Sequence, residues 1–300
     1  MHWQSRVVRK LFILLALILA AAASQALSAA ADFQLGLEAY QRGDYATALQ
    51  VWTPYADRGD GNAEYNLGLM YAHGQGVPKD ITKAIEWYRK AADQGVGAAQ
   101  YNLGVIYAKG EGVPVDREES AKWFRKAAEH GMGRAMNNLG RVYTDGPEAS
   151  HNDSEALKWY RDAADKGVAS AAFDLGLMYD LGHGVAQSFD EALKWYQKAA
   201  DAGYAPAYTN IGILYYNAQG VKRDLVQSYI WLSRAQKMGD PRAAELIDIP
   251  GSRLKPGQLK KAQAELAQWQ PPAAQPSPAA DPTLLFAPPP TTPAPKTIQQ

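Results

Sequence analysis

Apolar side chains recur along most of this chain with the spacing of α-helices. A first stripe has steps of three or four residues and ends at a glycine: Ala63, Leu67, Tyr71 and Gly74. A second stripe has charged residues on its opposite face: Ala84, Trp87, Tyr88 and Ala91. Such spacing keeps apolar groups on one side of a helix, so the pattern predicts two amphipathic helices joined by a short turn.

This helix pair is repeated with a period of 36 residues, and we call positions that lie 36 residues apart a column. One column pair is Leu67-Gly68, Leu103-Gly104, Leu139-Gly140, Leu175-Gly176 and Ile211-Gly212. The predicted units are 60–95, 96–131, 132–167, 168–203 and 204–239, between a shorter cap at 31–59 and closing helices at 240–270. Because a single unit cannot bury its own apolar face, the period predicts an all-α fold, a right-handed α-solenoid of about six helix-turn-helix units plus closing helices.

The start of the second helix of each unit carries a side chain that can accept hydrogen bonds from the first-turn N–H groups. These N-cap residues are Asp44, Asp80, Asp116, Asn152, Ser188 and Asp224. Three positions later stand Glu119, Glu155, Glu191 and Gln227, which we expect to complete capping boxes, with Lys83 as the exception.

A glycine column runs through the first helix, at Gly68 and its equivalents, although a glycine inside a helix costs about 1 kcal/mol relative to alanine. We expect close approach of a neighbouring helix backbone to offset that cost, with Ala84, Ala91 and Ala92 on the second helix as the facing residues. The Trp87 and Tyr88 columns are assigned to the core. Exposure of the tryptophans on an outer rim is the alternative.

The motifs A-x-x-N-L-G-x-x-Y-x-x-G-x-G-V-P-x-D and K-W-Y-x-K-A-A-x-x-G resemble the Sel-1-like repeat family, a branch of the tetratricopeptide-type superhelical proteins. The match covers residues 60–239. The resemblance implies an interaction scaffold in envelope signalling, assembly or secretion, with a partner protein or peptide in a concave groove lined by the first helices. The Gly-x-Gly segment is a turn here, because a phosphate-binding loop would need a preceding strand and a third glycine.

Composition narrows the function classes. Lys plus Arg equals Asp plus Glu at 31 each, so nothing favours a nucleic-acid partner. The chain has no cysteine, and its histidines fall in different columns without metal-ligand spacing. We therefore expect no enzyme activity, metal or cofactor. The alternative is a protein that binds or processes cell-wall glycan or peptide as a weak hydrolase, because a glycan-cleaving carboxylate pair has no sequence signature of its own.

Both ends of the chain differ from the repeats. Residues 1–30 place three basic residues before an apolar run of about 13 residues and then small residues, which predicts a cleaved signal peptide. We expect a periplasmic protein with no membrane span after cleavage; secretion, or anchoring through an uncleaved signal, is the alternative. Residues 271–300 contain ten prolines and are expected to be a disordered tail, or else a spacer or a ligand for another protein.

The groove prediction rests on two sets of residues. One is a ladder in a single column, at Asn66, Asn102, Asn138, Asp174 and Asn210, whose side chains can pair with a peptide backbone. The other is a central patch that breaks the repeat pattern, formed by Arg134, Asn137 and Arg141 with Tyr65, Tyr101 and Phe173 in adjoining units. We expect this patch to bind an acidic or carboxylate-bearing segment. The alternatives are that the ladder bonds the backbone of the neighbouring repeat and that the arginines only solvate a helix.

Overall fold

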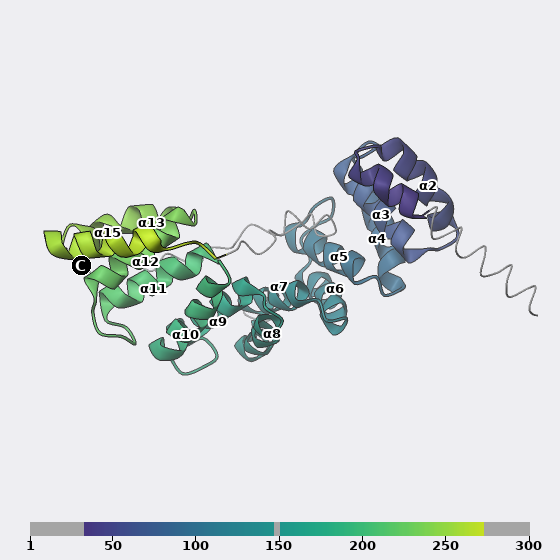
Figure 1. Ribbon diagram of the computed structural model, residues 1–300. Coiled ribbons are helices and arrows are strands. Elements are labelled where there is room, and N and C mark those ends of the chain that lie inside the picture. The colour runs from purple at the N-terminus through teal and green to yellow at the C-terminus, as the bar shows by residue number, and fades with distance from the viewer. Residues whose placement is uncertain (1–32, 147–150, 273–300) are drawn as a thin grey trace, which may run out of the picture. The chain divides into compact units, whose positions relative to one another are not determined.

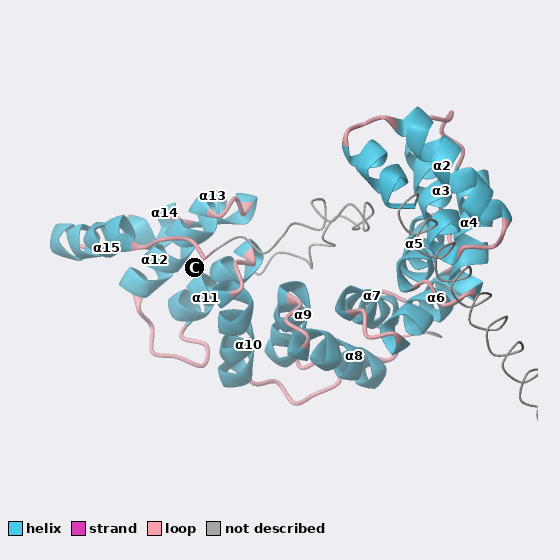
Figure 2. Ribbon diagram, turned by 45° about the vertical axis from the view of Figure 1, so that its right-hand side comes forward, coloured by secondary structure: helices cyan, strands magenta, loops and turns pink. Residues whose placement is uncertain are grey.

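The computed structural model describes residues 33–146 and 151–272, and this part of the chain is entirely helical (Figures 1 and 2). The all-α prediction is confirmed. Within the described ranges, no helix is long and apolar enough to cross a membrane. The signal peptide expected at 1–30 and nearly all of the tail expected at 271–300 lie outside the described residues.

The helices follow the 36-residue period. The five repeats consist of α3 (Gly61–His73) and α4 (Ile81–Asp93), α5 (Gly97–Lys109) and α6 (Arg117–Glu129), α7 (Gly133–Thr144) and α8 (Asp153–Asp165), α9 (Ala169–Leu181) and α10 (Phe189–Asp201), and α11 (Ala205–Asn217) and α12 (Leu225–Lys237). A helix at 33–41 and α2 (Tyr45–Asp57) precede them. The closing helices are α13 (Pro241–Leu246), α14 (Asp248–Gly251) and α15 (Pro256–Gln268), and α15 packs on α12.

The chain divides into two compact units, residues 1–99 and 100–300, with the division inside α5. The core of the first unit includes Trp52, Leu67 and Met70. The core of the second unit extends from Tyr101 to Ala243. Each unit therefore has its own apolar core.

The N-cap prediction is confirmed at all six positions, where the cap side chain accepts a hydrogen bond from a first-turn N–H. Glu119 and Glu155 do not form the expected capping boxes with their N-cap residues. Glu119 accepts bonds from Lys122 and Trp123, and Glu155 accepts one from Trp159, all further along the same helix. The indole N–H and ammonium groups three or four residues further on lie on the same helix face as these carboxylates and donate hydrogen bonds to them.

The turn between the two helices is closed by one recurring backbone bond. In each repeat the N–H of the cap residue donates to the carbonyl oxygen of a tyrosine nine positions earlier, at Tyr71, Tyr107, Tyr143, Tyr179 and Tyr215. The first helix ends at a left-handed glycine in repeats such as the first, at Gly74 with φ 70°, and the fourth, at Gly182 with φ 72°. In the last repeat Ala218 occupies this position with φ 57°, a conformation that favours glycine. Helix α7 instead ends at Asp145 in the right-handed region.

The glycine column does sit at a close approach, but its partner differs from the prediction. A Cβ placed on Gly140 would lie 2.6 Å from Cε1 of Tyr160, and Gly68 meets the Tyr88 ring in the same way. The alanines of the second helix were therefore the wrong facing residues. In the first four repeats the glycine is needed because a buried aromatic ring from the second helix occupies the space that a side chain would fill. In the last repeat a Cβ on Gly212 would meet Leu232 and the Ser228 carbonyl oxygen, which is a close backbone approach of the predicted kind.

The two aromatic columns have different surroundings. Tyr88, Tyr160 and Tyr196 are buried, as predicted for the core. In the tryptophan column only Trp123 is fully buried, and the others lie half-buried at the margin of the core. A cation covers the indole from the next turn in several repeats, as Lys90 does at 4.0 Å from the Trp87 ring centroid.

Candidate functional site

The structure places the predicted groove residues mostly inside the protein. Asn66, Arg134 and Arg141 remain partly exposed. The other seven are buried: Tyr65, Tyr101, Asn102, Asn137, Asn138, Phe173 and Asp174. Tyr65 and Asn66 belong to the first unit and the other eight residues to the second.

The three aromatic residues expected at the patch pack against aromatic residues of the second helices. Ring centroids lie 5.8 Å apart for Tyr65 and Tyr88, 5.7 Å for Tyr101 and Phe124, and 5.5 Å for Phe173 and Tyr196. These distances are typical of packed aromatic pairs. The aromatic surface that was predicted to contact a ligand is thus covered by other aromatic side chains of the same repeats.

The ladder column largely connects neighbouring repeats. Asn138 Nδ2 donates to the Tyr101 hydroxyl at 3.2 Å, and the Asn210 Oδ1 accepts from Arg242 at 3.4 Å. These contacts favour the alternative in which ladder residues bond a neighbouring repeat, through side chains instead of the backbone. Asn102 is different, because both of its side-chain polar atoms are buried without a hydrogen-bond partner in the described part of the chain.

Arg141 finds an acidic partner inside the protein. Its Nε lies 3.1 Å from Oδ2 of Asp174, a ladder residue of the next repeat. Burial alone would lower the pKa of the guanidinium, but the Asp174 charge raises it above its usual value. Burial raises the pKa of Asp174, and Arg141 offsets that rise only in part. The pair joins α7 to α9 and leaves little of Arg141 for an external carboxylate.

Three side chains of α7 and α9 are among those that remain at least partly exposed. Arg134, near the start of α7, is partly exposed, as is Leu177 on α9. Leu181, the last residue of α9, is 47% exposed. Beside Arg134, the buried Oδ1 of Asn137 has no hydrogen-bond partner among the described residues. We call Arg134, Leu177 and Leu181 the helix-A strip, where helix A is the first helix of each repeat.

The two leucines of the helix-A strip were not among the predicted site residues. A sequence signal for Leu181 exists, because its column otherwise holds His73, Lys109, Asp145 and Asn217. Leu181 is thus an exposed apolar side chain in a column that is otherwise polar.

Histidine and carboxylate side chains are the candidate metal ligands of this cysteine-free chain. Across residues 33–146 and 151–272, no group of three or more His, Asp or Glu side chains is arranged to hold a metal ion. His151 Nε2, in the turn just before α8, lies 2.9 Å from Oδ1 of Asp153, the first residue of that helix.

Comparisons with known proteins agree with the helix pattern. The Sel1 repeat model matches residues 61–96, 97–132, 133–168, 169–204 and 205–240. The structure is similar to that of c5321, a protective antigen of uropathogenic Escherichia coli strains with an SLR fold (TM-score 0.72, 35% identity), covering 80% of this chain and 52% of that one. It is also similar to a Sel1 repeat protein from Oxalobacter formigenes (TM-score 0.67, 32% identity), covering 82% and 99%.

Among curated proteins, the chain is 47% identical over 60 residues to the DAP3-binding cell death enhancer 1 of Mus musculus. That match spans 20% of this chain and only 12% of the mouse protein. The repeat model, by contrast, matches consecutive segments from residue 61 to residue 240. The chain belongs to the Sel1 repeat family.

Proposed function

We propose that the chain is an exported scaffold that binds a protein or peptide partner on the helix-A strip. The observation that carries the proposal is a difference in burial between the recurring and the non-recurring side chains of α7 and α9. Most side chains that recur with the period are buried in contacts between helices. Arg134 and Leu181, by contrast, depart from their columns, and together with Leu177 they are at least partly exposed. A repeat scaffold makes specific contacts at such variable positions.

Export is supported by the basic and apolar pattern of residues 1–30. The description of the similar Escherichia coli protein as a protective antigen agrees with exposure outside the cytoplasm, although this chain spans only 52% of it. We expect the mature protein to begin between Leu27 and Asp32 and to be periplasmic. Intact-mass measurement on fractionated cells tests this, and full-length protein with Met1 in the membrane fraction would contradict it.

Binding is tested by crosslinking in living cells, followed by capture and mass spectrometry. The variants are Arg134→Ala and Leu181→Ser. Arg141 is left unchanged, because its pair with Asp174 would mix a stability effect with a binding effect. Val115→Ser is the control, since Val115 is an apolar residue in the turn of another repeat and is 57% exposed, against 47% for Leu181.

A defined partner should be captured by the natural chain and by the Val115 control, and its affinity should fall about tenfold in the strip variants, which is about 1.4 kcal/mol. Unchanged capture by strip variants with normal circular dichroism would contradict the site. Cosedimentation with purified peptidoglycan, without any protein partner, would instead support the cell-wall alternative.

A further inference from the structure

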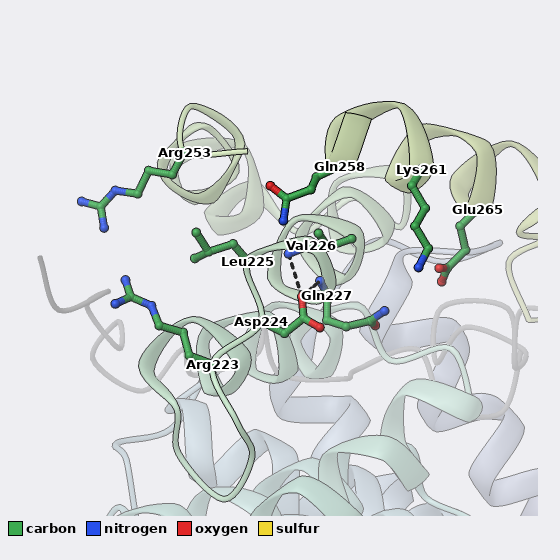
Figure 3. A pocket seen from close by; sticks show the side chains of 9 residues that line it. All are labelled: Arg223, Asp224, Leu225, Val226, Gln227, Arg253, Gln258, Lys261 and Glu265. Atoms are coloured by element: carbon green, nitrogen blue, oxygen red, sulfur yellow. Dashed lines mark hydrogen bonds between the residues drawn. The ribbon is translucent and has the colours of Figure 1, made fainter. Parts of the chain in front are cut away.

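A cleft of about 820 Å³ lies in the second unit, where the start of α12 meets the closing helices (Figure 3). Arg223, from the turn before α12, and Arg253, which follows α14, line one end of it. Gln258, Lys261 and Glu265 of α15 also line it, and Figure 3 shows Lys261 and Glu265 at the end away from the arginines. None of these residues belongs to the helix-A strip, so the cleft is a separate surface.

Both arginines rest on the same tyrosine. The guanidinium carbons of Arg223 and Arg253 lie 4.9 Å and 5.5 Å from the ring centroid of Tyr216, and Arg253 also donates to its hydroxyl. Tyr216 is 1% exposed, so its ring is fixed in the fold. Figure 3 shows the two guanidinium groups extending to the same side of the cleft. The fold therefore holds two like charges close together.

Neither arginine forms an ion pair within the parts of the chain that the structure describes. The two carboxylates of the cleft have other partners. Asp224 accepts from the N–H groups of Val226 and Gln227, at 2.9 Å and 3.0 Å, and so already caps α12. Glu265 pairs with Arg234 at 2.9 Å, and Figure 3 places it beside Lys261. The unbalanced positive charge is thus at the arginine end.

The features of this end are specific to the last repeat. The column of Arg223 otherwise holds Lys79, Val115, His151 and Gln187, and the column of Tyr216 holds Ala72, Ala108, Thr144 and Asp180. Arg253 lies beyond the repeats altogether. The requirements of repeat packing therefore explain neither the paired arginines nor the tyrosine beneath them.

We propose that this cleft binds an acidic peptide segment. A side-chain carboxylate is held by Arg223 and Arg253, because guanidinium groups donate two parallel hydrogen bonds to a carboxylate and retain their charge when stacked on an aromatic ring. The half-buried Leu225 and Val226 between the two ends provide apolar contact for a neighbouring side chain. Gln258 supplies an amide that can pair with the peptide backbone.

The test measures fluorescence anisotropy of a labelled hexapeptide of alternating glutamate and leucine, with the glutamine and leucine peptide as its uncharged match. The site variant is Arg223→Gln with Arg253→Gln. The control is Arg125→Gln with Arg161→Gln, which removes the same two charges from the same unit. Arg125 and Arg161 also donate to tyrosine hydroxyls, those of Tyr143 and Tyr179, outside the cleft.

The acidic peptide should bind the natural chain at least about tenfold more tightly than the glutamine peptide, and the site variant should abolish this difference while the control keeps it. Equal loss in the control, or equal binding of the two peptides, would overturn the proposal. Full displacement by inorganic phosphate at low millimolar concentration would also overturn it, because the cleft would then bind anions without peptide selectivity. Arg134→Ala should leave this binding unchanged, which separates the result from the helix-A strip.

Discussion

Arg141 of α7 and Asp174 of α9 form an ion pair between successive repeats, with only 15% and 10% of their side chains exposed. Both groups lost water on folding, and the raised pKa of Asp174 shows that Arg141 does not fully offset that loss for the carboxylate. Such a pair contributes little net stability as a whole, yet removing one member alone is strongly destabilising because the other charge stays buried without a partner.

Arg141→Met should therefore destabilise the second unit by about 3 to 5 kcal/mol, because it leaves the Asp174 carboxylate buried without its counter-charge. The double variant Arg141→Met with Asp174→Leu should return to within about 1 kcal/mol of the natural chain. Urea denaturation followed by circular dichroism measures both. An equally unstable double variant would contradict this account.

The matched control is Lys194→Met. Lys194 lies 2.6 Å from Glu191 on the same helix, but its side chain is 69% exposed, so water replaces the lost contact. We expect no change in the urea midpoint, since exposed ion pairs contribute little to stability.

Gly140→Val tests the contact between the glycine column and the aromatic column. The Tyr160 ring occupies the position of the new side chain, so unfolding should become easier by about 1 to 3 kcal/mol, toward the upper end of that range. Gly257→Ala is the control, because nothing lies within 4 Å of a Cβ added there on α15. A melting temperature unchanged by Gly140→Val would show that the ring can move away at little cost.

Ala218→Gly should stabilise the last repeat. Ala218 has φ 57°, and a left-handed conformation costs a residue with a Cβ about 1 kcal/mol or more. Part of this gain is lost to the greater freedom of glycine in the unfolded chain, so we expect a net increase of about 0.5 to 1 kcal/mol by thermal unfolding. Ala207→Gly, within α11, should have the opposite sign, and a loss of stability in Ala218→Gly would exclude strain at this turn.

The contacts of Asp240 predict that the free energy of unfolding falls at acidic pH. Burial raises its pKa, but hydrogen bonds from Arg242 and Thr209 more than offset that effect and hold the pKa below the ordinary 3.8. The stability from this group is thus fully present above about pH 4 and is lost as pH falls through the folded-state pKa. Asp240→Asn keeps a residue that can cap α13 but cannot titrate. Its unfolding free energy should fall less steeply than that of the natural chain below pH 4; parallel profiles would contradict the assignment.

The sequence by itself determined the period, the helix pairs and the caps of the second helices. Helix α9 begins 36 residues after α7, and Ser188 caps α10 as its column predicted. These features could be predicted because they depend on residues within about one helical turn, such as the side chain of Ser188 and the N–H of Glu191. Family membership followed from the same short-range pattern.

Only the tertiary structure decided which side chains meet. Gly140 lies against Tyr160, Arg141 pairs with Asp174, and Arg253 joins Arg223 on Tyr216, although each of these contacts joins different helices or turns. A column shows that a residue recurs but not whether it faces solvent, so ladder residues expected to meet a ligand are buried between repeats. The physical reason is that burial depends on the distance between neighbouring helices, which is set by the packing of all their side chains together.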